Sequence, residues 1–328
     1  MAYDFLAVGD ITTDAFIKLK DAHVTCKIDK KECELCMRFG DKLPYESVTE
    51  VRAVGNAPNA AVSAHRLGLS STIVTDIGDD RTGEDCMATL AQEGMSREFI
   101  SLHPGAHTNY HYVLQYEEER TILIKQEQYP YRLPNFSTPP KWFYLSSVAE
   151  NSLSYQLELA SYAAANKVKL AFQPGTFQMK AGIDALAAVY RTTEIFFCNK
   201  EEAQRILKTE EGDVKKLLGS IRKLGPRIAV ITDARNGAQA SDGTHGYFIP
   251  MYPDPAPPKN RTGAGDAFAS TVTAFLALGL SLEEALIRGP INSASVVQHI
   301  GAQAGLLSKD ELEAWYAKRP ADFKITLV

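Results

Sequence analysis

The sequence lacks several features, and each absence excludes a class of protein. Basic residues are not in excess, because 35 Lys and Arg stand against 40 Asp and Glu, giving a formal net charge of −5. We therefore expect neither nucleic acid nor an anionic membrane surface as a partner. The most apolar stretch, residues 267–282, is interrupted by Thr and Gly and is too short to span a bilayer. The N-terminal residues lack the basic segment that opens a secretory signal peptide.

Cysteine is also scarce, with five residues in a chain of 328. Without a secretory signal, we expect these cysteines to be reduced thiols and the protein to be cytoplasmic. The rest of the composition is ordinary, since 45% hydrophobic and 23% charged residues are typical of a globular protein. Length alone suggests about two domains, although single α/β domains also reach this size.

The stretch from Asn260 to Gly279 carries the strongest chemical signal. Four small residues, 262–265, lead directly into a helical pattern. The first turn of a helix offers unpaired N–H groups and the positive end of the helix dipole to an anion, and glycine lets the ligand approach closely. Asp266 falls in that turn, where a carboxylate suits a base that deprotonates a hydroxyl attacking phosphorus. An ordinary glycine-rich helix start with a first-turn acid gives the same pattern, so the remaining sequence must decide.

Strands and helices alternate regularly in the second half of the chain. Strands are expected at 142–145, 168–172, 194–198 and 227–232, and helices at 153–165, 180–188, 201–207 and 213–224. This spacing predicts right-handed crossovers and a mostly parallel sheet flanked by helices, an α/β fold. Further strands are expected at 3–9 and 71–77, a hairpin with mixed faces at 110–125, and an edge hairpin at 237–249.

Two polar segments follow expected strands in the first half of the chain. Asp10 and Asp14 come after the first strand, at the sheet edge where open α/β sheets bind ligands. The turn Gly55-Asn56-Ala57-Pro58-Asn59 opens an Ala-rich helix, and Asn59 can both donate and accept hydrogen bonds. Residues 15–54 between them are charged and irregular, which indicates an excursion from the main sheet.

Together these segments resemble the PfkB, or ribokinase-like, carbohydrate kinase family. Residues 260–268 (Asn-Arg-Thr-Gly-Ala-Gly-Asp-Ala-Phe) look like its second signature, and residues 55–59 resemble its first. Further matches follow in order: Gly9-Asp10 with Asp14, Arg66-Leu67-Gly68, Gly78-Asp79-Asp80, Asn199 with Glu202, and Gly301-Ala302. Two independent motifs about 200 residues apart make the resemblance specific, and it covers essentially the whole chain.

The resemblance implies a kinase that uses ATP and Mg²⁺, and it assigns roles by position. Asp266 would be the catalytic base, and the amides of Gly263, Ala264 and Gly265 would form the anion hole for the transferring phosphoryl group. The hydroxyls of the acceptor would be held by Asp14, Gly55 and Asn59. Mg²⁺ and phosphate would be organised through water by Asn199 and Glu202, with Glu202 as the residue nearest the metal. Positions along the nucleotide site would be Thr232, Gly237 and Asn292.

The resemblance also implies two structural parts. Residues 1–14, 55–107 and 126–328 would form the ribokinase-like α/β domain, and residues 15–54 and 108–125 a small β lid over the substrate. Lid closure would keep water from taking the phosphoryl group. The sequence leaves open a homodimer formed through the lid, any other oligomeric state, and dependence on a monovalent cation.

Three positions depart from the family pattern. Val54 stands where the first of two glycines is usual, so the substrate turn is expected to be tighter there. Asn260 replaces a frequent Asp and Asp233 a frequent Gly, and both lie by the expected nucleotide site. Neither the base nor the anion hole is touched, so we expect activity to be retained and the preferred nucleotide to stay open.

The acceptor has three alternatives. A hydroxymethyl group of a ribose- or fructose-type sugar comes first, because Asp14 and Asn59 suit neutral hydroxyls. An adenosine-type nucleoside comes second, since the lid carries aromatic residues that could stack on a base: Phe16, Phe39, Tyr45, Tyr110 and Tyr112. A phosphosugar comes third, with Arg52, Arg120 and Lys125 as cations for its phosphate.

Two functions from other classes remain. His23, Cys26, Cys33 and Cys36 have spacings compatible with a tetrahedral zinc site, which would make the lid a metal-stapled binding module. No second close pair of cysteines supports that site, so we predict a lid without zinc and ordinary buried thiols. A sugar-sensing protein on an inactive kinase scaffold is the other alternative, and the presence of Asp266 disfavours it.

Overall fold

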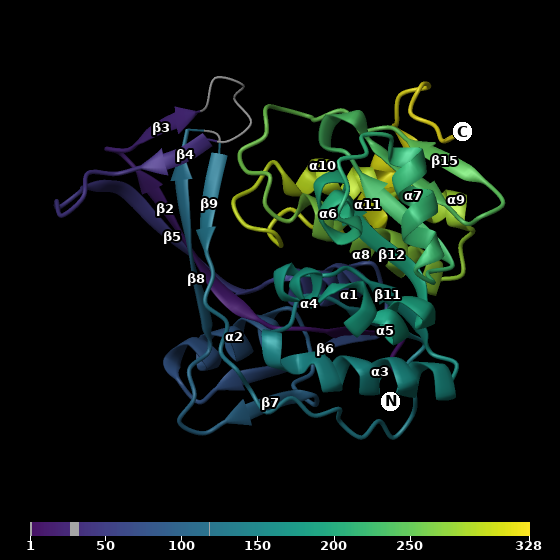
Figure 1. The fold of residues 1–328 in the computed structure, drawn as a ribbon, viewed down its shortest axis with the longest axis horizontal. Helices are drawn as coiled ribbons and strands as arrows, with labels where there is room; N and C mark the ends of the chain where they lie inside the picture. The colour runs from purple at the N-terminus through teal and green to yellow at the C-terminus, as the bar shows by residue number, and fades with distance from the viewer. Residues whose placement is uncertain (1, 27–32, 118) are drawn as a thin grey trace.

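A large sheet of buried β-branched and aromatic residues runs through the body of the molecule (Figure 1). The computed structural model describes residues 2–26, 33–117 and 119–328. Within them the ten strands lie in the order β16-β15-β14-β13-β12-β11-β10-β1-β6-β7. In chain order their bounds are β1 Phe5–Val8, β6 Ser71–Gly78, β7 Ile100–His103, β10 Trp142–Leu145, β11 Lys169–Phe172, β12 Thr193–Asn199, β13 Ile228–Thr232, β14 Ala238–Ser241, β15 Gly246–Ile249 and β16 Thr326–Leu327. The pairs from β13 to β7 are parallel and the β14–β16 edge is antiparallel, which confirms the expected α/β fold.

Helices cover both faces of the sheet (Figure 1). In β1, Phe5 and Ala7 belong to one apolar core and Leu6 and Val8 to the other, as the two-residue period of a strand requires. The first core is covered by α1 (Asn56–Arg66), α2 (Arg81–Gln92), α8 (Ala264–Ala277), α9 (Leu282–Leu286), α10 (Gly289–Val296) and α11 (Lys309–Ala317). The second is covered by α3 (Leu153–Ala165), α4 (Thr176–Ala185), α5 (Ala187–Thr192), α6 (Lys200–Leu207) and α7 (Val214–Lys223).

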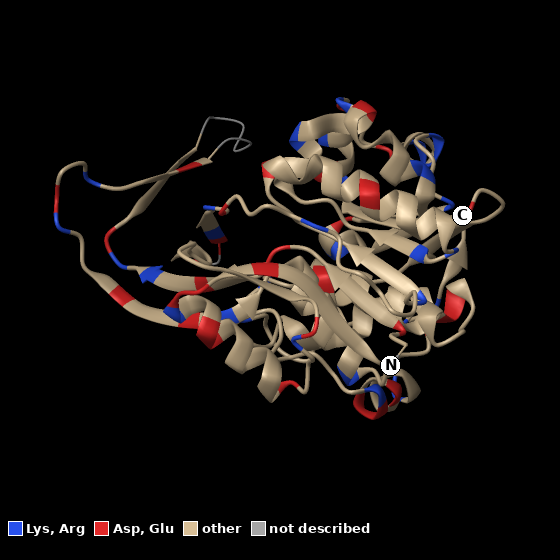
Figure 2. Cartoon of the chain, turned by 90° about the horizontal axis from the view of Figure 1, so that it is seen from below, with Lys and Arg blue, Asp and Glu red and all other residues tan. Residues whose placement is uncertain are grey.

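A second, four-stranded sheet lies beside the body and extends away from it (Figures 1 and 2). Its order is β5-β2-β8-β9, formed by β2 (Thr12–Leu19), β5 (Tyr45–Val54), β8 (Asn109–Tyr116) and β9 (Glu119–Leu123). Strands β2 and β8 are parallel and the other pairs antiparallel. A separate hairpin, β3 (His23–Cys26) with β4 (Cys33–Cys36), leaves this sheet between β2 and β5.

Three local expectations are corrected. Asp14 lies inside β2 and pairs with both β5 and β8, so it is not a loop residue after β1. The single helix expected at 180–188 is two helices, α4 and α5, and the backbone of Gly182 inside α4 has a φ of +84°. Strands β7 and β16 are short and were not expected.

The expectation that the cysteines are reduced, buried thiols is wrong for two of them. Cys26 and Cys33 form a disulfide, because the antiparallel register of β3 and β4 places them opposite each other with their Cα atoms 4.0 Å apart. Both strands lie mostly at the surface. Cys86 and Cys198 are buried thiols, and Cys36 is a partly buried one.

No helix in the described part of the chain has the length and apolar character to cross a membrane. No three His, Cys, Asp or Glu side chains there are grouped as metal ligands. The absence of zinc from the lid stays a prediction.

Candidate active site

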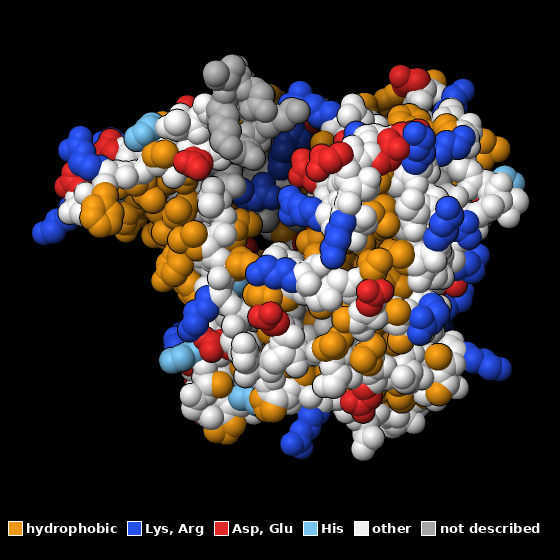
Figure 3. Space-filling view, viewed as in Figure 1, with side chains coloured by type: hydrophobic (Ala, Val, Ile, Leu, Met, Phe, Trp, Pro, Cys, Tyr) orange, Lys and Arg blue, Asp and Glu red, His pale blue; other side chains and the backbone are white. Residues whose placement is uncertain are grey.

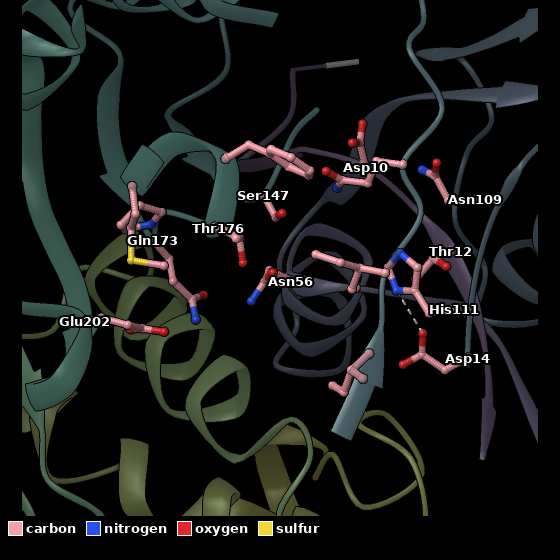
Figure 4. Close-up of a pocket in the computed structure, with 18 residues that line it drawn as sticks. Asp10, Thr12, Asp14, Asn56, Asn109, His111, Ser147, Gln173, Thr176 and Glu202 are labelled. Atoms are coloured by element: carbon pink, nitrogen blue, oxygen red, sulfur yellow. Dashed lines mark ion pairs between the residues drawn. The ribbon is translucent and has the colours of Figure 1, made fainter. Parts of the chain in front are cut away.

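A cavity with two lobes lies between the small sheet and the α/β body, where the space-filling view is hollowed (Figure 3). The wide lobe has a volume of about 240 Å³ and the narrow lobe about 90 Å³. Asp14, Gly55 and Asn56 line both lobes, so the two lobes adjoin at these residues. Asp266 lines the narrow lobe, whereas Asp10 and Glu202 line the wide one (Figure 4).

Asp266 sits in the first turn of α8, as the sequence predicts. The helix starts at Gly263, whose φ of +84° is unfavourable for other residues. A Cβ at this glycine would lie 2.3 Å from the Cβ of Ala302, so close packing also requires glycine there. A Cβ at Gly265 would meet no atom within 4 Å, which leaves open space for a ligand in front of that turn.

Three amide side chains donate hydrogen bonds to the Asp266 carboxylate. Asn56 Nδ2 lies 2.7 Å and Gln173 Nε2 3.0 Å from Oδ1, and Asn59 Nδ2 lies 2.8 Å from Oδ2. Burial raises the pKa of Asp266 and these hydrogen bonds oppose the rise, leaving a pKa above the usual value. The carboxylate is therefore fixed in orientation and more basic than an exposed Asp.

The sequence pointed to only one of these three donors. Asn59 was expected as a ligand of the acceptor, and its Oδ1 also accepts a hydrogen bond of 3.0 Å from Gln303 Nε2. Asn56 lies in the turn 55–59 that the sequence singled out, but the sequence assigned it no role. In the structure it is the first residue of α1 and lines both lobes. Gln173 follows β11, 93 residues before Asp266, and no local pattern connects the two.

The expected acceptor ligands Asp14 and Gly55 meet where the lobes join. The backbone of Gly55 has a φ of +118°, and a Cβ there would lie 3.0 Å from the carbonyl oxygen of Asp10. Asp14 Oδ1 lies 3.4 Å from His111 Nδ1, on the neighbouring strand β8 (Figure 4). The structure thus brings Asp14, Gly55, Asn59 and Asp266 to one cavity.

Of the residues expected to organise phosphate and nucleotide, Glu202 lines the cavity, whereas Thr232 and Gly237 do not. Asn199 and Glu202 cap α6 through two reciprocal hydrogen bonds of 2.8 Å, and Glu202 faces the wide lobe. Burial raises the pKa of Glu202, and the nearby Asp266 contributes to the rise. Thr232 and Gly237 flank the short turn between β13 and β14. None of the lining residues of either lobe comes from this turn.

Asn292 is not available to a ligand. Its side chain is 0% exposed in α10, donates to Thr271 Oγ1 at 2.8 Å, and accepts from the backbone N–H of Leu307 at 2.9 Å. The residue ties α8 and α10 to the segment before α11. We leave it out of the proposed nucleotide site.

Most side chains expected to stack on a base or hold a phosphate lie outside the cavity. Of the five aromatic residues, only Phe16 lines a lobe, and Phe39, Tyr45 and Tyr112 are largely exposed. Arg52 pairs with Glu50 at 3.1 Å, and Lys125 pairs with Glu127 at 2.7 Å. Arg120 lines neither lobe, although its charge interacts with those of Asp14 and Asp266.

Known proteins are similar to this chain over most of its length. The model of the pfkB family carbohydrate kinases matches residues 23–309. An ATP-dependent 6-phosphofructokinase of Thermoanaerobacterium thermosaccharolyticum is 23% identical, covering 96% of this chain and 94% of its own. Mouse ribokinase is 26% identical, covering 79% of this chain and 82% of its own.

Solved structures share the fold. The nucleoside kinase of Methanocaldococcus jannaschii superposes with a TM-score of 0.79 at 17% identity, covering 97% of this chain and all of its own. Arabidopsis thaliana ribokinase, complexed with ribose and ATP, gives a TM-score of 0.79 at 16% identity, covering 96% and 98%. The large sheet with its helices and the small sheet therefore belong to one fold, which these solved structures share.

Proposed function

Because the chain belongs to the pfkB family of carbohydrate kinases, we propose that it transfers the γ-phosphoryl group of ATP to a hydroxymethyl group of a small sugar. Members of this family are ATP-dependent phosphotransferases. The observation that carries the proposal is the Asp266 carboxylate, which three amides hold at the N-terminal turn of α8 in a cavity also lined by Asp14. The sugar as acceptor and the catalytic roles of these residues are our inference.

Asp266 acts as the general base. A sugar hydroxyl is a weak nucleophile, and a carboxylate that accepts its proton as the O–P bond forms lowers the barrier. The amides of Asn56, Asn59 and Gln173 stabilise the ionised form and aim it, so the base is positioned before the substrate arrives. The acceptor hydroxyls bind to Asp14, Gly55 and Asn59.

The first turn of α8 serves as the anion hole. The amides of Gly263, Ala264 and Gly265 stand at the positive end of a 14-residue helix, and the space in front of Gly265 is open. Negative charge that builds up on the phosphoryl oxygens is stabilised there, beside the base. Lys and Arg side chains border the mouth of the hollow, where the remaining phosphates of ATP would enter (Figure 3).

Glu202 and Asn199 fit a magnesium ion. Mg²⁺ in kinases is held by one or two carboxylates, water and substrate phosphates rather than by a cage of protein ligands, and Glu202 supplies such a carboxylate in the wide lobe. Bound Mg²⁺ would neutralise charge on the phosphates. Thr232 and Gly237 are proposed to contact the nucleotide farther from the base.

The small sheet is proposed to be the lid, formed from residues 15–54 and 108–125. It contributes Phe16, His111 and Ile122 to the cavity, so its position controls whether the cavity is complete. Closing it over the substrate would exclude water from the phosphoryl group.

A nucleoside is the second candidate acceptor. The wide lobe is walled by Ile122, Ile124, Phe177 and Met179, and such apolar walls could hold a flat base next to the sugar. A panel of sugars, sugar phosphates and nucleosides with ATP and Mg²⁺, assayed by ADP release, separates the alternatives. A nucleoside that exceeds every sugar tenfold in kcat/KM, about 1.4 kcal/mol of transition-state preference, would replace the sugar. Failure of every acceptor would refute the kinase proposal.

A further inference from the structure

Several buried polar atoms around the cavity make no hydrogen bond within the protein, although Asp14 Oδ1 forms an ion pair with His111. In the described part of the chain, nine buried side-chain oxygen or nitrogen atoms make no hydrogen bond. Five of them belong to residues that line the two lobes: Asp10 Oδ2, Asp14 Oδ1, His111 Nε2, Gln126 Oε1 and Thr262 Oγ1. Because buried polar atoms are almost always satisfied, this concentration indicates groups that a bound molecule completes.

Asp10 is the most deeply buried acid among them. Its side chain is 6% exposed, and Tyr131 Oη donates a hydrogen bond of 2.8 Å to Oδ1. The second oxygen, Oδ2, makes no hydrogen bond, although the backbone of Ala149 acts on the carboxyl and opposes the rise in its pKa. Asp10 lines the wide lobe but not the narrow lobe that holds Asp266 (Figure 4). The family resemblance gave this residue no role in binding.

The ionisable side chains that line the cavity are mostly acidic. The wide lobe is lined by three carboxylates, those of Asp10, Asp14 and Glu202, and Asp266 adds a fourth in the narrow lobe. No described Lys or Arg lines either lobe. Among the described residues that line the lobes, His111 is the one with a basic side chain, and Arg120 acts on Asp14 and Asp266 from outside the lobes. A phosphate placed beside Asp10 would face carboxylates without a compensating cation.

We propose that Asp10 determines substrate specificity: its Oδ2, with Gln126 and His111, binds a hydrogen-bond-donating substituent of the acceptor, an amino or hydroxyl group. This inference rests on the proposed kinase activity of the same cavity. The reacting hydroxyl lies in the narrow lobe at Asp266, and the rest of the acceptor extends through the junction at Asp14 into the wide lobe. Neutral and amino-substituted acceptors are accepted there, and acceptors with a phosphate at that end are rejected.

The test compares Asp10→Asn with Tyr131→Phe. Asp10→Asn keeps the shape of the side chain and an acceptor for Tyr131, and it replaces the unpartnered Oδ2 by an amide nitrogen, which donates a hydrogen bond instead of accepting one. Tyr131→Phe removes the partner of Oδ1 and leaves the Oδ2 atom in place. Because the Tyr131 hydrogen bond opposes the rise in the pKa of Asp10, all variants are assayed well above pH 7, where the carboxyl is ionised. Probes are D-ribose, D-fructose, D-glucosamine and cytidine, with D-fructose 6-phosphate as the anionic acceptor. KM and kcat for acceptor and for ATP are measured for each variant.

For Asp10→Asn we expect KM for the best acceptor to rise about 10- to 100-fold, the usual worth of a hydrogen bond to a charged group, with KM for ATP changed less than about threefold. Tyr131→Phe should lower Tm but change the acceptor KM less than about threefold. Equal acceptor KM values in wild type and Asp10→Asn would overturn the proposal, as would equal effects of the two variants. Preference of the wild type for fructose 6-phosphate would also overturn it.

Binding measured without turnover separates this inference from the kinase proposal. The same probes are titrated in a thermal-shift assay in the absence of ATP. If none is phosphorylated but one stabilises wild type and not Asp10→Asn, the kinase proposal fails and the Asp10 subsite stands. If none stabilises wild type, the subsite proposal fails.

Discussion

The buried carboxyl of Asp10 makes the folding stability depend on pH in a defined direction. Burial raises the pKa of Asp10 from 3.8 to about 7, although the hydrogen bond from Tyr131 opposes the rise. An acid whose pKa is raised in the folded state contributes stability that is present below pH 4 and is lost as the pH rises through 7. Between pH 5 and pH 8, these two pKa values give a loss of about 2–3 kcal/mol.

Asp10→Asn removes this titration and keeps an acceptor for Tyr131. Urea unfolding of wild type and variant at pH 5, 6, 7 and 8, without ligands, gives the free energy of unfolding for each. The advantage of the variant over wild type should grow by about 2–3 kcal/mol across this range. Burial also raises the pKa values of Glu202 and Asp266, but these groups are common to both proteins and cancel in the difference. Asp76 repels the Asp10 carboxylate, so this repulsion is lost in the variant and forms part of the measured difference.

Asp4→Asn is the matched control. Burial acts to raise the pKa of Asp4, but hydrogen bonds from Lys141 and the backbone of Ser70 outweigh it and hold the pKa below 3.8. Its titration therefore lies below the tested range, and the difference between this variant and wild type should stay constant from pH 5 to pH 8. If the Asp10→Asn difference is equally constant, within the 10–15% error of extrapolation, Asp10 ionises normally and the argument from burial is refuted.

Four further outcomes are expected. Asn56→Leu removes one donor to the Asp266 carboxylate, so the acid limb of the kcat–pH profile should move upward by about one pH unit; an unmoved limb would contradict the role of the amides. Gly265→Val should keep its Tm while KM for ATP rises at least tenfold, because the added side chain enters open space in front of the helix. Gly263→Val should lower Tm by several degrees, since its φ of +84° and the contact with Ala302 forbid a side chain; equal Tm values for the two variants would refute the distinction. Purified protein should contain no stoichiometric zinc by elemental analysis, and one equivalent of zinc that is lost in Cys33→Ser would show that these cysteines bind metal.

The sequence predicted best where local pattern decides the structure. Strand 142–145 and helix 153–165 are found at the expected residues, because both combine a clear period with a buried face. The break of the expected helix near Gly182 was missed, since a glycine can lie inside a helix or interrupt it. The strand character of Thr12–Leu19 was also missed, because polar residues interrupt its apolar alternation.

Contacts between residues far apart in the sequence were the part of the site that was hardest to predict. The two signatures located Asp266, Gly55 and Asn59, which the structure brings to one cavity. The role of Gln173 could not be predicted from the sequence, because its hydrogen bond to Asp266 depends on where β11 ends relative to α8. The disulfide between Cys26 and Cys33 was missed for a related reason, since only the register of the hairpin places the two cysteines opposite each other.

The most direct test of the central claim is the rate of phosphoryl transfer in Asp266→Asn. The variant keeps the shape of the side chain and removes the base. The single-turnover rate constant for phosphoryl transfer to the best acceptor, and kcat with it, should therefore fall about 10²- to 10⁴-fold. KM for ATP and for the acceptor should change little, because Asn can still hydrogen-bond the hydroxyl. A variant that retains more than a tenth of the wild-type kcat, with chemistry shown to be rate-limiting, would contradict the assignment of Asp266 as the general base.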